Sequence, residues 1–364
     1  MYYKLRPNKV LRKEKSIPLA QLLMGEQDPS SFKRAVFRKK PSYRCVKVED
    51  TALLPPLVDR NWHNLKRLCC QYLPYKDVQY KEYRIPKRSG GFRLIEEPYP
   101  SLKYLQRSVV RILEDIGGTS HTAAYGYVKG RGTLGAVQKH QRAGSRWFLK
   151  VDIHDFFGSC TPAFVEQMLA RITPFNKLVT EGIEHSAFSV CFRHDRLPQG
   201  APSSPIITNM LMIPFDHELS VWARKYGLLY TRYADDLLIS GREGFDYNEV
   251  IGQIESLFRQ FEMPFTLNKK KTRYGNINGR NWNLGLMLNK DNDITVGYRN
   301  KKRLKAMLCN IASNAQTNPA SKEERNKILG ILSYHQSIDK GYTDYLVSKC
   351  SEKWQIDVMQ FLKS

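Results

Sequence analysis

The sequence predicts an α+β protein. Stretches with the apolar spacing of helices and short stretches rich in β-formers follow one another without regular β-α-β order. At 364 residues, the chain is long enough for two or three subdomains. Its 58 Lys and Arg residues against 35 Asp and Glu give a formal charge of +23, which predicts a surface that binds polyanions.

The positive charge is concentrated in two segments. Residues 1–47 carry 13 Lys or Arg against 3 acids, and residues 269–305 carry 11 against 2. Because Lys and Arg that neutralise phosphates release counterions, we expect these segments to contact a nucleic-acid backbone. A solvated basic face is the alternative for either segment alone.

The cysteines and the apolar segments indicate where the protein works. Seven cysteines without a C-x-x-C motif predict neither a disulfide framework nor a zinc module. The first ten residues lack a signal-peptide core, and no apolar run is long enough to span a bilayer. We therefore expect a cytoplasmic protein with reduced thiols and no membrane partner.

The first part of the chain predicts a basic N-terminal extension over residues 1–58, followed by a helix, a hairpin and a second helix. Helical spacing appears in residues 61–73. KEYRIPKRSGGFRLIEEP, residues 81–98, predicts two strands joined at a glycine turn. SLKYLQRSVVRILEDI, residues 101–116, predicts a helix with Ser101 as its N-cap.

The second part begins with RWFLKVDIHDFF, residues 146–157, which predicts a strand that runs into a turn. A helix is expected to follow from Thr161. Residues 201–227 predict a long amphipathic stretch after their prolines, ending at Gly227. YTRYADDLLIS, residues 230–240, predicts a β-hairpin, and shorter strands and a helical C-terminal segment complete the chain.

Three acidic residues stand at the ends of predicted strands. Asp152 ends the apolar strand WFLKV, and the adjacent Asp235 and Asp236 occupy the tip of the YTRYADDLLIS hairpin. Adjacent carboxylates repel unless cations hold them, and carboxylates that converge from separate strands can hold the two metal ions of a phosphoryl-transfer site. All-oxygen ligands predict Mg²⁺, two ions, with Mn²⁺ as a substitute. On its own, the short motif has a turn with exposed acids as its alternative explanation.

Seven blocks of sequence carry a resemblance to a known family. In order along residues 81–300 they are YRIPKRSGGFRLIEEPYPSLKYLQR, AAYGYVKGRGTLGA, LKVDIHDFF, RLPQGAPSSPIITNML, YTRYADDLLIS, FTLNKKKTRY and WNLGLML. Their order and spacing resemble bacterial reverse transcriptases of the retron, group II intron and defence-associated types. The resemblance implies a right-hand polymerase architecture, with fingers, a palm that contains an antiparallel sheet, and a small helical thumb.

The resemblance also implies a division of the chain. We expect the basic extension at 1–58, the fingers with part of the palm at 59–145, the palm with fingers insertions and primer grip at 146–298, and a helical thumb at 299–364. The last segment is too short for an RNase H domain or an appended endonuclease. A retroviral enzyme or a complete intron-mobility enzyme is therefore not expected.

The family pattern assigns roles to the acids and to one aromatic residue. It makes Asp152, Asp235 and Asp236 the catalytic acids that bind metal. Phe157 matches the aromatic that lies under the incoming sugar, where a ring leaves no room for a 2′-hydroxyl and so favours dNTPs. An ordinary core aromatic is the alternative for Phe157.

Further nucleotide contacts come from three blocks. Gln199 and Gly200 resemble the loop that contacts the nascent base pair, where glycine allows close backbone approach. Arg93 and Lys87 match the fingers residues that grip the triphosphate, a role suited to a guanidinium and an ammonium group. Lys271 aligns with a lysine proposed as general acid toward the leaving pyrophosphate.

Contacts with primer and template are also implied. Leu284 and Gly285 resemble the grip that positions the primer end, and Arg131 aligns with a contact to the template backbone. Packing or surface charge is the alternative for all three. His154 follows the strand that carries Asp152, and we expect it to be structural or solvent-facing.

Two segments depart from the retron pattern. Residues 136–140 keep only His140 of the retron Asn-Ala-x-x-His, and residues 283–285 keep only the glycine of Val-Thr-Gly. Residues 329–346 nevertheless resemble the retron thumb. The departures favour the defence-associated branch, whose members work with an adjacent noncoding RNA.

The resemblance implies an RNA-directed DNA polymerase that copies an associated noncoding RNA into DNA in antiphage defence. Its partners would be that RNA, the DNA product and dNTPs, with an accessory protein or a homo-oligomer left open. One alternative is a retron reverse transcriptase that makes RNA-linked single-stranded DNA. Another is a catalytically silent RNA-binding scaffold, which an intact set of acids argues against. A nucleotide cyclase or an RNA polymerase is disfavoured by the fingers hairpin and by Phe157.

Overall fold

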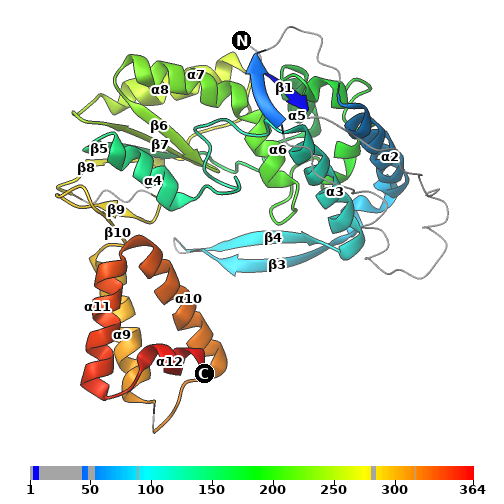
Figure 1. Ribbon diagram of the computed structural model, residues 1–364. Helices are drawn as coiled ribbons and strands as arrows, with labels where there is room; N and C mark the ends of the chain where they lie inside the picture. Colours follow the sequence, from blue (N-terminus) through cyan, green and yellow to red (C-terminus); the bar gives the residue numbers. More distant parts are fainter. Residues whose placement is uncertain (1–2, 8–42, 48–53, 88–89, 280–283, 316) are drawn as a thin grey trace. The chain divides into compact units, whose positions relative to one another are not determined.

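The computed structural model describes residues 3–7, 43–47, 54–87, 90–279, 284–315 and 317–364 (Figure 1). Within these residues, helices and antiparallel strands are mixed without β-α-β order, which confirms the expected α+β class. Most of the N-terminal extension expected over residues 1–58 lies outside the described residues. Its described parts form two antiparallel strands, β1 (Tyr3–Pro7) and β2 (Tyr43–Lys47), and the start of the helix α2 (Pro56–Tyr72).

The helices are α2 (Pro56–Tyr72), α3 (Pro100–Ile116), α4 (Thr133–Arg142), α5 (Pro162–Ala170), α6 (Ser204–Leu211), α7 (Ile213–Lys225), α8 (Tyr247–Gln260), α9 (Tyr298–Ser313), α10 (Lys322–Ile338), α11 (Lys340–Trp354) and α12 (Val358–Lys363). Short 3-10 helices are η2 (Leu73–Val78), η3 (Phe175–Leu178), η4 (Ala187–Cys191) and η5 (Lys269–Lys271). The strands are β1 (Tyr3–Pro7), β2 (Tyr43–Lys47), β3 (Tyr80–Pro86), β4 (Phe92–Pro98), β5 (Trp147–Asp152), β6 (Leu229–Tyr233), β7 (Asp236–Gly241), β8 (Arg273–Asn276), β9 (Met287–Leu288) and β10 (Ile294–Thr295).

The chain divides into two compact units, each made of three segments. The first unit consists of Met1–Thr122, His154–Glu218 and Ser256–Thr266. The second consists of Ala123–Ile153, Leu219–Glu255 and Leu267–Ser364.

The helices α2 and α3 pack against each other and against η4 in the first unit. The buried residues of α2 include Val58, Trp62 and Leu65, whose spacing places them on one face of the helix. The indole of Trp62 meets the ring of Phe188 edge to face, with 5.0 Å between ring centroids. Residues from distant parts of the sequence thus build one apolar layer.

The start of α3 differs from the expectation that Ser101 caps it. The cap residue is Tyr99, and the helix begins at Pro100. Proline suits the first helical position because its missing N–H would have had no intrahelical partner there and its φ is already helical. The expected cap was therefore wrong by two residues.

The long amphipathic stretch expected after the prolines of residues 201–227 forms two helices, α6 and α7, that meet at Met212. Pro214 is the second residue of α7 and has no N–H to donate to the carbonyl of Met210. Proline also disfavours a helical backbone at the residue before it. The break follows from this proline.

The second unit contains a four-stranded antiparallel sheet with strand order β6-β7-β5-β8 (Figure 1). The helix α4 packs on β6. Apolar residues of α4, the sheet and the β9–β10 region form a buried cluster: Val137, Phe148, Leu238, Ile277, Leu286, Leu288 and Val296. This core fixes the sheet that carries the acidic residues.

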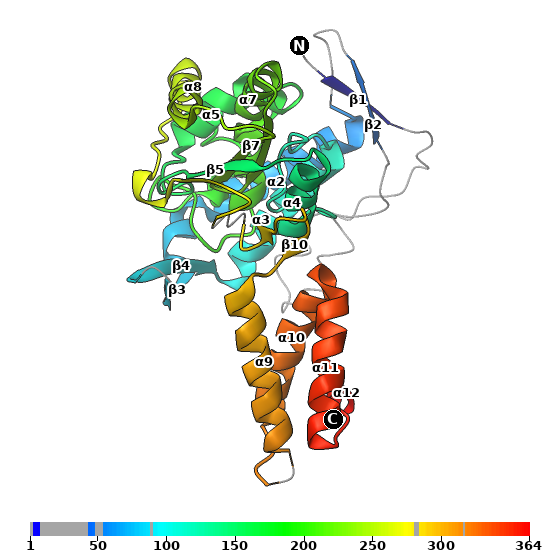
Figure 2. The same ribbon diagram turned by 90° about the vertical axis from the view of Figure 1, so that its left-hand side faces the viewer.

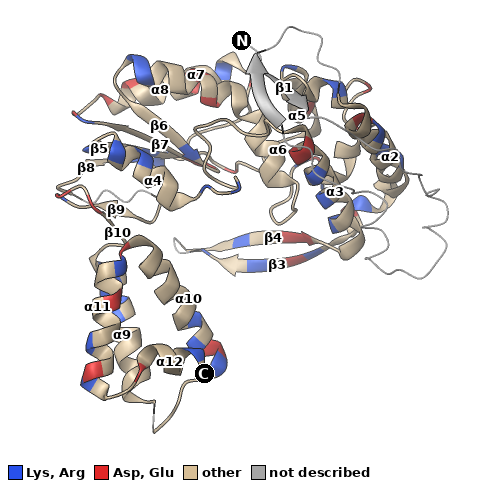
Figure 3. Ribbon diagram, in the orientation of Figure 1, with Lys and Arg blue, Asp and Glu red and all other residues tan. Residues whose placement is uncertain are grey.

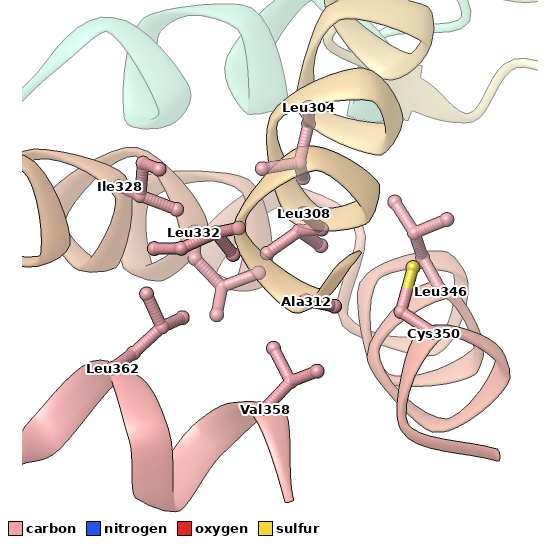
Figure 4. Packing of buried hydrophobic residues seen from close by; sticks show 10 residues of the cluster. Leu304, Leu308, Ala312, Ile328, Leu332, Leu346, Cys350, Val358 and Leu362 are labelled. Carbon is pink, nitrogen blue, oxygen red and sulfur yellow. The ribbon is translucent and has the colours of Figure 1, made fainter. Parts of the chain in front are cut away.

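The helices α9 to α12 form a C-terminal bundle in the same unit (Figure 2). Its buried residues face one another from all four helices and include Leu308, Leu332, Leu346 and Leu362 (Figure 4). A capping box at Ser321 stabilises the start of α10, because Ser321 and Glu324 satisfy each other's backbone N–H groups. Among the helices of the described residues, none is long and apolar enough to cross a membrane.

Candidate active site

Three acids, Asp152, Asp235 and Asp236, come together at one end of the four-stranded sheet and are called here the acid cluster. Asp152 is the last residue of β5, Asp236 is the first of β7, and the two are register partners on adjacent strands. Asp235 lies in the β6–β7 turn, where its carbonyl accepts a hydrogen bond from the N–H of Ile153 at 2.9 Å. Strand pairing therefore brings the three acids to one end of the sheet, where burial and then the charges of Asp236 and Asp152 raise the pKa of Asp235.

The turn that carries Asp235 is stabilised by contacts with Arg232 and Gly126. Ala234 has a positive φ of 56°. The guanidinium of Arg232, which is fully buried, donates to the carbonyl of Ala234 at 3.2 Å. Gly126 lies so close that a Cβ at this position would be 2.5 Å from the backbone nitrogen of Ala234. A buried cation and a glycine thus support the unusual backbone of the turn.

Two lysines neutralise part of the acid cluster. The Nζ of Lys271 lies 2.9 Å from both carboxylate oxygens of Asp152. The Nζ of Lys150 lies 2.9 Å from Oδ2 of Asp236. Lys150 stands two residues before Asp152 on β5, so both side chains point to the same face of the sheet.

Burial and repulsion between carboxylates raise the pKa values of Asp235 and Asp236. Burial, followed by the nearby Asp236 carboxylate, raises the pKa of Asp235 to about 6. Burial also raises the pKa of Asp236, although the Lys150 ammonium acts in the opposite direction. Carboxylates with raised pKa values often lie at functional sites. A nearby cation would favour the charged forms of Asp235 and Asp236.

Four residues expected to contact a nucleotide lie together in the first unit. Lys87, Arg93, Phe157 and Gln199 line one hollow of about 240 Å³. Lys87 and Arg93 are exposed at the tip of the β3–β4 hairpin, which carries both basic and acidic residues (Figure 3). The lining also includes Arg196 and two acids, Glu96 and Asp155, so three cations, two carboxylates, aromatic rings and an amide surround the hollow. Cations beside an aromatic ring suit a phosphorylated ligand with a flat or sugar-like face.

The base of this hairpin is fixed by an ionic group that we call the Glu96 cluster, made of the buried Glu96 and Arg193 and the more exposed Arg196 and Glu82. The Glu96 carboxylate is 1% exposed and accepts hydrogen bonds of 2.8–3.0 Å from both arginines. Arg193 also bonds to Glu82 at 2.7 Å. Charge-assisted hydrogen bonds of this length are strong and directional, so the cluster fixes the base of the hairpin.

The backbone of the Gln199 loop is joined to the same hairpin. The N–H of Glu96 donates to the carbonyl of Gln199 at 2.7 Å. Gly200 has a φ of 128°, and a Cβ there would be 2.8 Å from the carbonyl oxygen of Glu96. Only glycine fits this close approach.

The residues expected at the primer and template lie in the second unit. Leu284 and Gly285 both have positive φ values and follow residues 280–283, which lie outside the described residues. The guanidinium of Arg131 lies 5.7 Å from the ring centroid of Tyr125 and donates to the carbonyl of Ala124 at 2.7 Å.

The two histidines singled out in the sequence lie in different surroundings. His154 is exposed. His140 is fully buried between the hydroxyls of Ser240 and Thr231, at 2.5 and 2.8 Å. Its place at the end of residues 136–140 is thus a packing position inside the protein.

Comparison with known proteins identifies the family. The model of the family "Reverse transcriptase (RNA-dependent DNA polymerase)" matches residues 85–331. The retron Ec83 reverse transcriptase of Escherichia coli is 30% identical over 292 residues, which cover 76% of this chain and 88% of that protein. The chain belongs to the reverse transcriptase family. The retron Mx65 reverse transcriptase of Myxococcus xanthus is also 30% identical, over 74% of this chain and 64% of that protein.

Other relatives agree with a retron-type bacterial reverse transcriptase. The retron Ec86 enzyme of Escherichia coli is 28% identical over 72% of this chain and 78% of its own length. Among solved structures, the apo telomerase of Candida tropicalis aligns with a TM-score of 0.46 and 14% identity over 79% of this chain and 61% of its own. Membership of the family makes the chain an RNA-directed DNA polymerase with a right-hand polymerase fold.

The departures at residues 136–140 and 283–285 therefore do not exclude a retron-type enzyme. Relatives with retron names match most of the chain despite them. At residues 136–140 the structural reason is visible for the retained residue, since His140 serves the core of the sheet.

Polymerases of this family generally use divalent metal ions, and the acid cluster fits such ions by its chemistry. Its donors are carboxylate oxygens, the ligands that Mg²⁺ and Mn²⁺ prefer. Within the described ranges, no three His, Cys, Asp or Glu side chains are arranged in a ready metal-ligand group. The ammonium groups of Lys150 and Lys271 already occupy the oxygens of Asp236 and Asp152. The acid cluster fits a cation because its three carboxylates outnumber the two ammonium groups, and not because its ligands are already arranged around an ion.

Three features of this reverse transcriptase were missed in the sequence. They are Lys150, Arg232 and the Glu96 cluster. Lys150 had a readable signal, because a lysine two residues before Asp152 in an apolar strand must share its face. Arg232 had none, because its burial depends on the distant 123–126 segment that pairs with its backbone. The Glu96 cluster had none, because its arginines lie about a hundred residues from Glu96.

Proposed function

We propose that this reverse transcriptase copies an associated noncoding RNA into DNA by a two-metal mechanism at Asp152, Asp235 and Asp236, in antiphage defence. The observation that supports it most is the pairing of Asp152 with Asp236 on adjacent strands, with Asp235 in the turn beside them. Relatives that are named retron reverse transcriptases support an RNA partner, because a reverse transcriptase copies an RNA template.

The acids would hold two Mg²⁺ ions, with Mn²⁺ as a substitute. Bound divalent ions would supply the charge that activates the primer hydroxyl and neutralises the leaving pyrophosphate. The protein's own part is to fix the carboxylates, which β5, β7 and the supported turn do. Asp235, with a pKa of about 6, gains most from a nearby cation.

In this proposal the hollow lined by Phe157 binds the incoming dNTP. Arg93 and Lys87 hold the triphosphate, Phe157 lies under the sugar and excludes a 2′-hydroxyl, and Gln199 contacts the new base pair. Gly200 supports this role by allowing the backbone of the Gln199 loop to approach Glu96 closely.

The remaining site residues complete the reaction. Lys271, whose ammonium contacts Asp152, would donate a proton to the leaving pyrophosphate. Leu284 and Gly285 would position the primer end, and Arg131 would contact the template backbone.

The proposal also divides the chain into the subdomains of a polymerase. A basic extension at 1–58 precedes fingers at 59–145, a palm at 146–298 and a helical thumb at 299–364. The enzyme would act in the cytoplasm with dNTPs as substrates and DNA as product. The retron alternative, in which the DNA stays linked to the RNA, is favoured by the names of the relatives.

The experiment is nucleotide incorporation by the protein purified with the RNA that it carries from its native locus. Labelled dNTPs or NTPs are supplied with Mg²⁺, and the product is sequenced. DNA complementary to the bound RNA, absent with Asp235→Ala, is the expected result. A DNA product that stays joined to RNA under denaturing conditions, and that becomes shorter when RNase removes the RNA, would favour the retron alternative.

Two results would contradict the proposal. Bound RNA without any DNA product would indicate a catalytically silent scaffold. Incorporation of NTPs in preference to dNTPs would indicate an RNA polymerase instead.

A further inference from the structure

The side chain of Lys150 occupies a position that the reaction described above does not use. It lies on β5 and reaches diagonally across to Asp236 on β7, with 2.9 Å between Nζ and Oδ2. The two side chains are 26% and 23% exposed, so solvent screens the pair only partly. An ammonium group thus sits on an oxygen of one of the proposed metal ligands.

The charges around the acid cluster explain why a cation stays there. Three carboxylates converge, and burial disfavours their charged forms. Lys271 contacts Asp152, but its side chain is 53% exposed and lies on the short helix η5. Lys150 is anchored in the middle of a paired strand, so its position is fixed by the sheet itself.

We propose that Lys150 is a positioning residue for divalent-ion binding, because its ammonium group holds Asp236 in place before ions bind and competes with them for that carboxylate. The inference rests on the proposed function, in which the acid cluster binds the ions. Its physical basis is that a fixed positive charge near a carboxylate stabilises the empty site and repels an incoming cation.

Removing the ammonium group has two opposite consequences. Without ions, the carboxylates of the acid cluster lose a counter-charge, and the protein becomes less stable. With ions, the competitor is gone, and binding becomes tighter. If Lys150 were only structural, its removal would lower the stability of the protein and leave the affinity for ions unchanged. Ion affinity is therefore the deciding measurement.

The test uses the full chain with Lys150→Met and Lys150→Gln, titrated with Mg²⁺ or Mn²⁺ while the melting temperature and the bound ion are followed. Lys150→Arg keeps the positive charge and should restore wild-type affinity. The matched control is Lys301→Met, because Lys301 pairs with Asp339 in the C-terminal bundle at a similar exposure, 24% and 25%.

The expected result is a lower melting temperature without ions and a half-saturating ion concentration that falls about 3- to 10-fold, an effect of roughly 1 kcal/mol. Lys301→Met should lower only the melting temperature. An unchanged or higher half-saturating concentration in both Lys150 variants would overturn the inference.

A second variant separates this inference from the proposed function. Asp236→Asn should weaken ion binding if the acid cluster is the ion site. Ion binding equal to the wild type in Asp236→Asn would overturn the metal site itself, and the role of Lys150 with it. Weakened binding in Asp236→Asn together with unchanged binding in the Lys150 variants would overturn the role of Lys150 alone.

Discussion

The neighbouring residues Phe156 and Phe157 lie in different surroundings, one in the core and the other at the hollow. Phe156 is buried and packs against Phe265, with 5.2 Å between ring centroids. Phe157 is half-buried and lines the hollow that also contains Arg93 and Gln199. This arrangement supports the role of Phe157 as the residue that excludes a 2′-hydroxyl.

Phe157→Ala should therefore admit ribonucleotides. Removing the ring opens space for the 2′-hydroxyl, and we expect the preference for dNTPs over NTPs to fall roughly 10- to 100-fold. The ratio of kcat/KM for dCTP and CTP measures this. Phe156→Leu is the control, which should lower stability but keep the preference. An unchanged preference in Phe157→Ala would sink the assignment.

His140 makes the stability of the protein depend on pH. Burial lowers the pKa of its imidazole to about 3, whereas the unfolded chain has the ordinary value of about 6.5. Between these values the unfolded chain binds a proton that the native protein does not. The contribution of His140 to stability is thus complete above pH 6.5 and is lost as the pH falls, by about 1.4 kcal/mol for each pH unit.

Urea unfolding between pH 7 and pH 4.5 checks this prediction. Stability should fall with pH in the wild type and fall less steeply in His140→Gln. His185→Gln, which changes an exposed histidine, should keep the wild-type slope. Equal slopes in all three proteins would show that His140 is not the group that titrates.

At the residue scale, the acids could be predicted from the sequence and their supports only in part. The two adjacent aspartates of the YADD motif, Asp235 and Asp236, can be read directly from the sequence. The burial of Arg232 under Ala234, by contrast, depends on the three-dimensional path of the 123–126 segment beside β6. The same holds for Glu96, whose two arginines lie about a hundred residues away.

The β3–β4 hairpin depends on the Glu96 cluster for its position. Glu96→Gln leaves Arg193, whose side chain is 9% exposed, with less compensating charge. We expect a lower stability by about 2–4 kcal/mol and a several-fold higher KM for dNTPs, because the hairpin carries Arg93. RNA affinity should change little.

Thermal unfolding and steady-state kinetics measure the two effects. Glu97→Gln is the matched control, since Glu97 follows in the same strand but its side chain is 41% exposed and paired with Lys103. It should keep wild-type stability and KM. A Glu96→Gln protein that is less stable but has an unchanged KM would show that the cluster serves folding alone.

At the element scale, periodicity predicted the existence of most elements and mistook some boundaries. The β3–β4 and β6–β7 hairpins and the helix after Thr161 were predicted correctly. The break between α6 and α7 was not, because the apolar pattern continues across Pro214 while the hydrogen-bond ladder does not. Local backbone chemistry decided these boundaries.

The charge of the whole molecule makes its binding to RNA sensitive to salt. With a net charge of +23, many Lys and Arg residues are available to displace counterions from phosphates. If at least six phosphates are contacted, affinity should fall by about 10³-fold between 50 and 200 mM KCl. Filter binding across this range tests it. A nearly flat salt dependence would show that base or shape recognition dominates.

The most direct test of the central claim is primer extension on a defined RNA template, with RNA affinity measured in parallel for wild type, Asp152→Asn and Asp235→Asn. If the acid cluster is the catalytic centre, both variants lose at least about a thousandfold in DNA synthesis. RNA affinity should stay within about threefold, since phosphate contacts elsewhere supply most of it. DNA synthesis at near wild-type rates in either variant would contradict the account.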